Sequence, residues 1–140
     1  MKIAIGADHG GYLLKNQIVE HLKGAGHDVE DCGTHDSSSV DYPHFAKMVT
    51  AAVKNETAQL GILVCGSGIG MSMAANKVNG IRAALCFNAY MGRMTRAHNN
   101  ANILCLGARV TNPSLVNNIV ETFINAEFDG GRHEKRIEKF

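Results

Sequence analysis

Short, mainly apolar runs alternate along this chain of 140 residues with longer amphipathic segments. The runs at 2–6, 60–64, 81–86 and 103–106 have the composition of strands that are buried on both faces. A more polar run at 27–31 predicts a weaker strand, nearer an edge of the sheet. The chain therefore offers five candidate strands.

The segments between these runs carry apolar residues at helical spacing. They predict helices at about 12–22, 44–54, 71–77, 89–99 and 112–125. Regular alternation of strands and helices predicts an α/β fold, with a parallel sheet covered by helices on both faces. We see no repeat or linker and expect one domain over residues 1–140, with a glycine-broken, charged tail at about 129–140.

The stretch LGILVCGSGIGMSM, residues 60–73, concentrates the chemistry. A buried strand ends in Cys65, a glycine-rich turn follows at 66–70, and a helix begins after it. This order aims backbone N–H groups at an anion. The same field would stabilise the thiolate of Cys65. The stretch thus predicts an anion or oxyanion cradle beside a nucleophile or base.

Other polar side chains also follow strands, and parallel strands bring their carboxyl ends to one rim of the sheet. The polar residues that follow strands are Asp8, His9, Cys65, Ser67, Asn88 and Arg109. We expect this rim to be the functional one. Arg82 begins a strand and belongs on the opposite rim.

Composition and charge exclude several classes of partner. The chain is 45% hydrophobic and 19% charged with a net charge of +1, so it has no overall field to attract nucleic acid or a membrane surface. No apolar run approaches the roughly 20 residues that span a bilayer. The N-terminus lacks the apolar core of a signal peptide. We expect a cytoplasmic protein with no nucleic-acid or membrane partner.

Familiar motifs do not fit the glycine-rich turn. Position 71 is methionine. A dinucleotide-binding fingerprint would need glycine at this position, and a cysteine phosphatase would need arginine. No P-loop sequence is present. The four cysteines form no C-x-x-C pair, and Asp8, His9, Asp41 and His44 lack a metal-ligand spacing. We therefore expect no metal and no cofactor.

Several side chains admit two interpretations. Cys65 fits proton abstraction next to a carbonyl, with the amides of 66–70 holding an enediolate oxygen, or it is a covalent nucleophile that needs an adjacent base. Ser67 is a cradle hydroxyl or a turn former, and Tyr42 a substrate contact or a packing residue. His98 and Asn99 are a ring-opening acid/base and its neighbour, or only the polar end of a helix.

Basic residues suit a phosphorylated small molecule because an arginine fork matches phosphate geometry. Arg109 follows the fifth strand, and Arg132 and Arg136 are four residues apart, so they share a face if the tail is helical. The alternative for the last two is a solvated terminal charge run.

The whole chain resembles the sugar-phosphate isomerase family that contains ribose-5-phosphate isomerase type B and the galactose-6-phosphate and allose-6-phosphate isomerases. The matching segments are IGADHGG at 5–11, DYP at 41–43, CGSGIGMS at 65–72, AANK at 74–77, GIRA at 80–83, RAHNNAN at 96–102 and GGRH at 130–133. Many type B ribose enzymes have threonine where this chain has Ser67, which keeps the hydroxyl.

The resemblance implies a three-layer, Rossmann-like α/β/α sandwich with a five-stranded parallel sheet. It also implies a metal-free aldose–ketose isomerase that interconverts ribose 5-phosphate and ribulose 5-phosphate. A six-carbon sugar phosphate is the alternative substrate, and a non-catalytic nucleotide- or phosphate-binding module is the alternative of another class. Family members are dimers or tetramers with shared sites, so we expect a homodimer or a dimer of dimers, with the tail packed on the partner subunit.

The resemblance also implies roles for individual residues. Cys65 looks like the base that moves a proton between C1 and C2, and His98 and Asp8 look like the ring-opening pair. Ser67 joins them as a catalytic residue. His9, Arg109, Arg132 and Arg136 look like phosphate ligands. The remaining implied substrate contacts are Tyr42, Gly66, Gly68, Ile69, Gly70 and Asn99. His98 and some arginines would serve the site of the neighbouring subunit.

Overall fold

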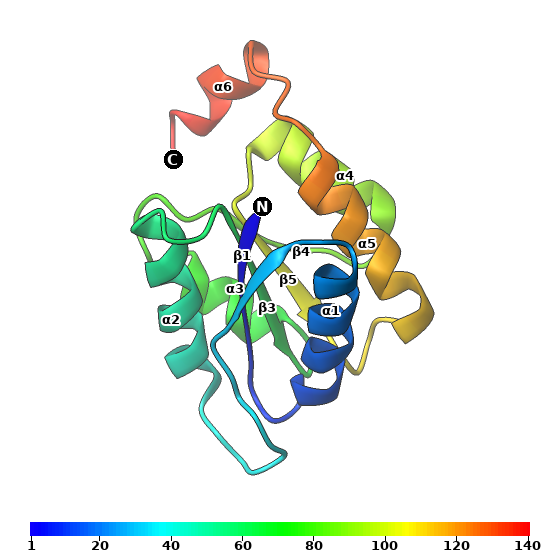
Figure 1. Ribbon diagram of the computed structural model, residues 1–140. Helices are drawn as coiled ribbons and strands as arrows, with labels where there is room; N and C mark the ends of the chain where they lie inside the picture. The colour runs from blue at the N-terminus through cyan, green and yellow to red at the C-terminus, as the bar shows by residue number, and fades with distance from the viewer.

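The computed structural model describes residues 1–140 and contains a five-stranded sheet between two layers of helices (Figure 1). The strands are β1 (Lys2–Ala7), β2 (Asp28–Asp31), β3 (Leu60–Cys65), β4 (Ala83–Leu85) and β5 (Ile103–Gly107). All neighbours in the sheet are parallel, in the order β2-β1-β3-β5-β4. The predicted fold class is confirmed.

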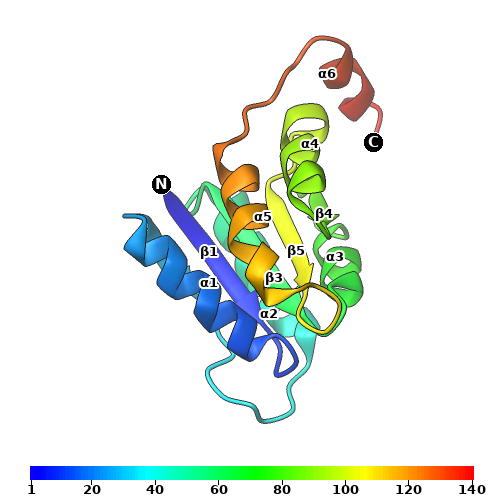
Figure 2. The ribbon, with the colours of Figure 1, turned by 90° about the vertical axis from the view of Figure 1, so that its right-hand side faces the viewer.

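Six helices connect and follow the strands. They are α1 (Tyr12–Gly24), α2 (Tyr42–Lys54), α3 (Ile69–Ala75), α4 (Ala89–Asn99), α5 (Pro113–Asn125) and α6 (Arg132–Ile137). Helices α1, α4 and α5 cover one face, and α2 and α3 cover the other (Figure 2). The strand order reverses between β1 and β3, so the carboxyl ends of these two strands flank the crevice in which α/β folds bind ligands.

The two apolar clusters follow the alternation of side chains along the central strands. Ile62 and Val64 of β3 face the layer of α1 and α5, whereas Leu63 and Cys65 face α2 and α3. Every residue of β3 is buried, as its continuous apolar run predicts. Cys65 therefore reaches the carboxyl edge from the α2–α3 face of a rigid central strand.

Some element boundaries differ from those predicted. Strand β4 has only three residues instead of the predicted 81–86, because it lies at an edge of the sheet. On its free side the amide of Asn76 takes the place of a neighbouring strand: its Nδ2 donates to the Ala83 carbonyl and its Oδ1 accepts the Ala83 N–H. The polar strand β2 forms the other edge, as predicted.

Helices α2 and α3 each begin two residues earlier than predicted, and α6 was not assigned from the sequence. Helix α3 starts at Ile69, inside the glycine-rich turn, because Gly68 adopts a positive φ of 77° and lets the chain turn directly into the helix. The charged tail contains α6, which begins after Gly130 and Gly131, both at positive φ. Helix α6 packs on the end of α4, away from the loops that follow β1 and β3 (Figures 1 and 2).

Candidate active site

The loops after β1 and β5 meet the glycine-rich turn around Gly10. A methyl group added at Gly10 would lie 3.3 Å from Oδ1 of Asp8, 3.3 Å from the Gly66 nitrogen and 3.4 Å from Nη2 of Arg109. Asp8, Arg109 and the turn after Cys65 are thus brought together, as the rim argument predicts. A side chain at position 10 would therefore push these three segments apart by a few tenths of an ångström.

The turn itself packs against the loop after β5. The Arg109 N–H donates to the Gly66 carbonyl over 2.9 Å, and a methyl group added at Gly66 would lie 3.1 Å from Nη1 of Arg109. At Gly107 the methyl group would lie 2.5 Å from the Ser67 carbonyl oxygen. The missing side chains therefore let the guanidinium of Arg109 lie directly against the turn.

Cys65 ends β3 with only 5% of its surface exposed, and its Sγ accepts the Gly68 N–H over 3.1 Å. That hydrogen bond holds the sulfur against the glycine-rich turn. The amides of Gly66, Ser67 and Gly70 donate to no other group of the chain. The turn therefore combines a hydrogen-bonded sulfur with unengaged N–H groups, which suits an acid/base centre beside a developing oxyanion.

The neighbouring thiols have a different environment. Burial raises the pKa of Cys86 to about 12, and burial is also the main cause that raises the pKa of Cys105. Burial, with the charges of Glu30 and Asp31, raises the pKa of Cys32 to about 11. These three thiols therefore stay protonated near neutral pH and do not suit the role of a base.

Asp8 and His9 are oriented by backbone amides. Asp8 is 9% exposed and its Oδ1 accepts the Gly11 N–H over 3.1 Å. Nδ1 of His9 lies 3.2 Å from the Val40 nitrogen and accepts its N–H. Because Nδ1 is occupied by this hydrogen bond, Nε2 is the ring nitrogen left free to contact a ligand.

Tyr42 packs its ring against the glycine-rich turn. A methyl group added at Gly70 would lie 2.7 Å from Cζ of Tyr42, although the tyrosine is still 37% exposed. Tyr42 is thus both a packing residue and a side chain with exposed surface at the turn. Ile69, the first residue of α3, is also exposed next to it.

The other predicted site residues lie at the opposite edge of the sheet. Helix α4 starts after the carboxyl end of β4 and ends before the amino end of β5, so His98 and Asn99 lie at the amino edge. Arg132 and Arg136 lie on α6, which packs there, and both are exposed. β3 has six residues, or about 20 Å at 3.3 Å per residue, which is longer than a sugar phosphate.

His98 is held against the tail at this edge. Its ring stacks on that of His133 with centroids 4.2 Å apart, and the Asp129 N–H donates to the Ala97 carbonyl over 2.9 Å. Desolvation, followed by the charges of His98, Arg132 and Arg136, lowers the pKa of His133. The end of α4 and the tail therefore form one cluster of imidazole and guanidinium groups.

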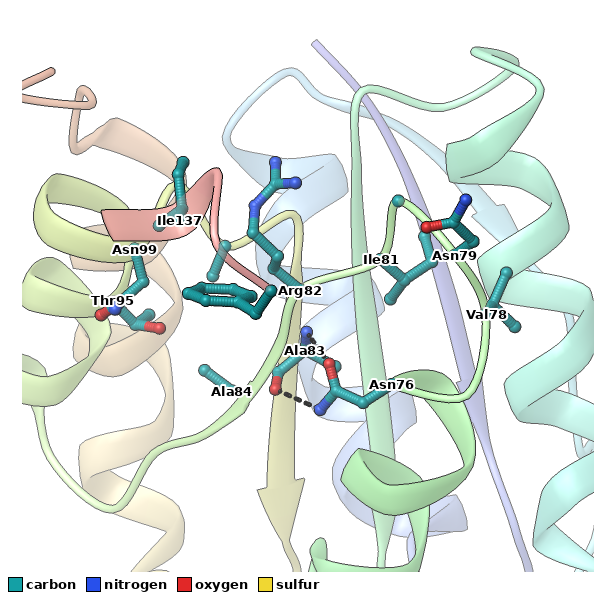
Figure 3. A pocket seen from close by; sticks show the side chains of 13 residues that line it. Asn76, Val78, Asn79, Ile81, Arg82, Ala83, Ala84, Thr95, Asn99 and Ile137 are labelled. Atoms are coloured by element: carbon teal, nitrogen blue, oxygen red, sulfur yellow. Dashed lines mark hydrogen bonds between the residues drawn. The ribbon is translucent and has the colours of Figure 1, made fainter. Parts of the chain in front are cut away.

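Each edge has a cavity. One of about 290 Å³ adjoins His9 and Arg109 at the carboxyl edge. One of about 620 Å³ lies at the amino edge, where Arg82 extends between Asn99 on one side and Ile81 on the other (Figure 3). The expected place of Arg82 on the rim away from Cys65 is confirmed. Asn88 does follow β4, but its side chain accepts the Met91 N–H and caps α4.

Sequence reasoning missed two contributors to these clusters. The Val40 amide orients His9 through the backbone, which leaves no trace in residue types. Asp129 stands in a charged tail that looked like an ordinary solvated segment, and only the fold places its carboxylate 3.8 Å from Nε2 of His98. No helix of the structure has the length and apolar character needed to cross a membrane.

A three-layer α/β/α fold, with a thiol and unengaged amides at its carboxyl edge, has the arrangement that suits an enzyme acting on a small anion. The family model of the ribose/galactose isomerases matches residues 3–140. The chain belongs to this family, and it is an isomerase of that group. The family resemblance and the isomerase class expected from the sequence are confirmed.

Individual relatives agree with this assignment. The chain is 46% identical to ribose-5-phosphate isomerase B of Escherichia coli strain K12 over 137 residues, which are 98% of this chain and 92% of the relative. The structure of Clostridium thermocellum ribose-5-phosphate isomerase B superposes with a TM-score of 0.98 at 56% identity, covering 99% of this chain and 94% of the other. Mycoplasma genitalium ribose-5-phosphate isomerase B with bound ribulose 5-phosphate has a TM-score of 0.93 at 46% identity, covering 99% and 92%.

Proposed function

We propose that this chain interconverts ribose 5-phosphate and ribulose 5-phosphate through an enediolate, with Cys65 as the base. One observation carries the proposal: Sγ of Cys65 accepts an amide N–H inside a turn in which the amides of Gly66, Ser67 and Gly70 are unengaged. The proposal is supported by the relatives named ribose-5-phosphate isomerase B, one of them in complex with ribulose 5-phosphate.

The proton transfer needs no cofactor. The Cys65 thiolate removes the proton from C2 of the open-chain aldose, and the electron pair moves to the carbonyl oxygen at C1. The amides of the turn from Gly66 to Gly70, with the Ser67 hydroxyl, stabilise that oxyanion. The proton of the C2 hydroxyl then moves to the C1 oxyanion, and the thiol returns its proton to C1 while the electron pair left on the C2 oxygen forms the ketone.

Ring opening and phosphate binding involve residues from both the carboxyl edge and the amino edge of the sheet. His98 and Asp8 transfer the protons that open the furanose ring, while His9, Arg109, Arg132 and Arg136 hold the phosphate. Tyr42 and Asn99 contact the sugar, as do Gly68 and Ile69 of the turn. Because His98, Asn99, Arg132 and Arg136 lie at the amino edge, these four act in the site of a second subunit. The working form is then a homodimer or dimer of dimers, with the tail at 129–140 packed on the partner.

Residues 1–140 act as one sugar-phosphate isomerase domain in this proposal. The cytoplasm is its proposed location, because all four cysteines are free thiols, as reducing conditions require.

An assay of ketose formation from ribose 5-phosphate in EDTA tests this proposal. The wild type should be active, and Cys65→Ala should lose about 10²- to 10⁴-fold in kcat, the range expected when a general base is removed. Cys86→Ala, which changes a buried thiol outside the turn, should stay within a few-fold of wild type. Equal inactivity of wild type and Cys65→Ala on all sugar phosphates would leave a non-catalytic binding module instead. Loss of wild-type activity in EDTA would contradict the metal-free mechanism.

The preferred sugar is decided by kcat/KM measured on ribose 5-phosphate, allose 6-phosphate and galactose 6-phosphate. We expect ribose 5-phosphate to have the highest value, although one carbon unit is worth only about 10- to 200-fold. A higher value for a six-carbon substrate would reassign the substrate and leave the class of reaction intact.

A further inference from the structure

Three possible metal ligands converge where the tail meets the end of α4. His98 belongs to α4, Asp129 to the segment before α6, and His133 to α6. Nε2 of His98 lies 3.8 Å from Oδ2 of Asp129, and one ligand atom of each of the three residues lies within 4.8 Å of the others. Among the histidine, cysteine and carboxylate side chains of the chain, this is the group of three with such spacing.

The backbone holds the three side chains next to one another. The Asp129 N–H donates to the Ala97 carbonyl over 2.9 Å, beside His98, and the His133 N–H donates to the Gly130 carbonyl over 3.0 Å. Neither imidazole makes a hydrogen bond to the protein, and the Asp129 carboxylate has only the loose contact with His98. The ligand atoms are therefore close together and uncommitted.

Two imidazoles and a carboxylate form a donor set for zinc and its neighbours in the first transition row. Bond lengths of about 2.0–2.2 Å place ligand atoms of a tetrahedral zinc site about 3.3 Å apart. The observed spacing must contract by about 1.5 Å at most, and the stacked rings must turn toward one point. His98 and Asp129 have side chains that are 40% and 58% exposed, so they have room to rotate.

Charge limits the affinity of such a site. Arg132 and Arg136 on α6 are positive and oppose a cation, whereas Asp129 alone offsets part of the ion's charge. We therefore expect binding in the micromolar range, weaker than that of a structural zinc site.

We propose that Zn²⁺ binds to His98, Asp129 and His133 and inhibits the isomerase by occupying the imidazole nitrogen that moves the proton in ring opening. The inference rests on the proposed role of His98. The ion is an inhibitor and not a cofactor, because a metal-bound nitrogen has no lone pair left to accept a proton.

Binding is tested without any assay of activity. The full chain is titrated with Co²⁺, whose visible absorption reports coordination by protein ligands, and with Zn²⁺ by calorimetry. We expect one ion per chain, with binding weakened about tenfold or more in His133→Gln and in Asp129→Asn. His44→Gln, which changes an exposed histidine elsewhere, and Cys65→Ala should bind as wild type does. Unchanged binding in His133→Gln and Asp129→Asn, or loss of binding in Cys65→Ala, would overturn the proposal.

Inhibition is the second arm. Zn²⁺ should inhibit the wild type, and EDTA should restore its activity. Asp129→Asn should need about tenfold more Zn²⁺ to lose the same fraction of its own activity measured in EDTA. Equal Zn²⁺ sensitivity of the two proteins would refute the inhibitory role. The two proposals fail separately: a chain that binds Co²⁺ through these residues but isomerises no sugar contradicts the function alone, and an active enzyme that binds no Co²⁺ contradicts the metal site alone.

Discussion

The carboxyl edge and the amino edge of the sheet present their polar residues in opposite ways. At the carboxyl edge, Cys65 and Asp8 are at most 9% exposed, and glycines press the surrounding loops into contact. At the amino edge, Asn99, Arg132 and Arg136 are exposed, and two of them stand on a helix of six residues at the end of the chain.

This difference indicates what fixes each group. The carboxyl edge is positioned by the packing of its own chain, which suits a base and an oxyanion cradle that must not move. The amino-edge residues are held by one helix end and a short tail. Their final geometry then depends on what packs against them, which agrees with the proposed role in a neighbouring site.

Complementation between two inactive variants tests whether the two edges belong to one site formed by two subunits. Cys65→Ala and His98→Gln are each expected to be nearly inactive, but they damage opposite edges of the chain. If a site combines one edge from each subunit, a heterodimer carrying one copy of each variant has one intact site and one doubly damaged site. Co-expression with two tags and purification on both should recover up to about half of the wild-type activity per dimer.

The matched control pairs Cys65→Ala with Asp8→Asn, both at the carboxyl edge, which should recover no activity. No recovery in the test pair would place all the residues in the site of one chain, and recovery in the control would assign Cys65 and Asp8 to different halves of a shared site.

Thiol reactivity should distinguish Cys65 at the carboxyl edge from the other buried cysteines. Burial raises the pKa of Cys86 to about 12, so at pH 8 only about one molecule in 10⁴ carries its thiolate, against about one in ten for a thiol with the ordinary value near 9. Because the pKa is raised, reactivity should appear only as the pH rises toward 12. Iodoacetamide labelling at pH 8, followed by peptide mass spectrometry, should modify Cys65 well before Cys86 or Cys105. Labelling of Cys86 as fast as Cys65 would contradict this.

Arg136 at the amino edge should affect substrate binding, measured as KM, more than the chemical step, measured as kcat. Arg136→Gln removes a charged donor from the proposed phosphate site, and a charge-assisted hydrogen bond of about 1.5–3 kcal/mol corresponds to roughly 10- to 100-fold. We expect KM for ribose 5-phosphate to rise by that factor with little change in kcat or in Tm, because the side chain is exposed. Lys135→Gln on the same helix removes the same charge and should change KM far less. Equal effects of the two variants would indicate a general field instead of a specific contact.

A glycine-to-alanine substitution in the glycine-rich turn should lower activity, whereas the same substitution at the end of α1 should not. In Gly70→Ala the new methyl carbon would lie 2.7 Å from Cζ of Tyr42 and must displace the ring. We expect kcat/KM to fall about tenfold, consistent with the cost of a small misplacement in a positioned site. Gly24→Ala, at the end of α1, meets no atom within 4 Å and should keep both activity and Tm. Unchanged kcat/KM in Gly70→Ala would remove Tyr42 from the site.

Much of the fold follows from local sequence. The apolar run that ends in Cys65 predicts a central strand, and the polar run at 27–31 predicts an edge strand, because burial on two faces or one dictates residue type. The predicted strand at 81–86 was too long. On one side this strand pairs with the Asn76 side chain instead of another strand, and the spacing of apolar residues carries no sign of that contact.

The sequence by itself determined the α/β class, the family and the convergence of Asp8, Cys65 and Arg109, because parallel strands deliver their carboxyl ends to one edge whatever the details of packing. The position of His98 and Asn99 at the amino edge, together with Arg132 and Arg136, is known only from the tertiary structure. The same is true of their closeness to Asp129 and His133. That grouping depends on how a short helix packs on the end of α4, a contact between segments that lie more than 30 residues apart and share no local pattern.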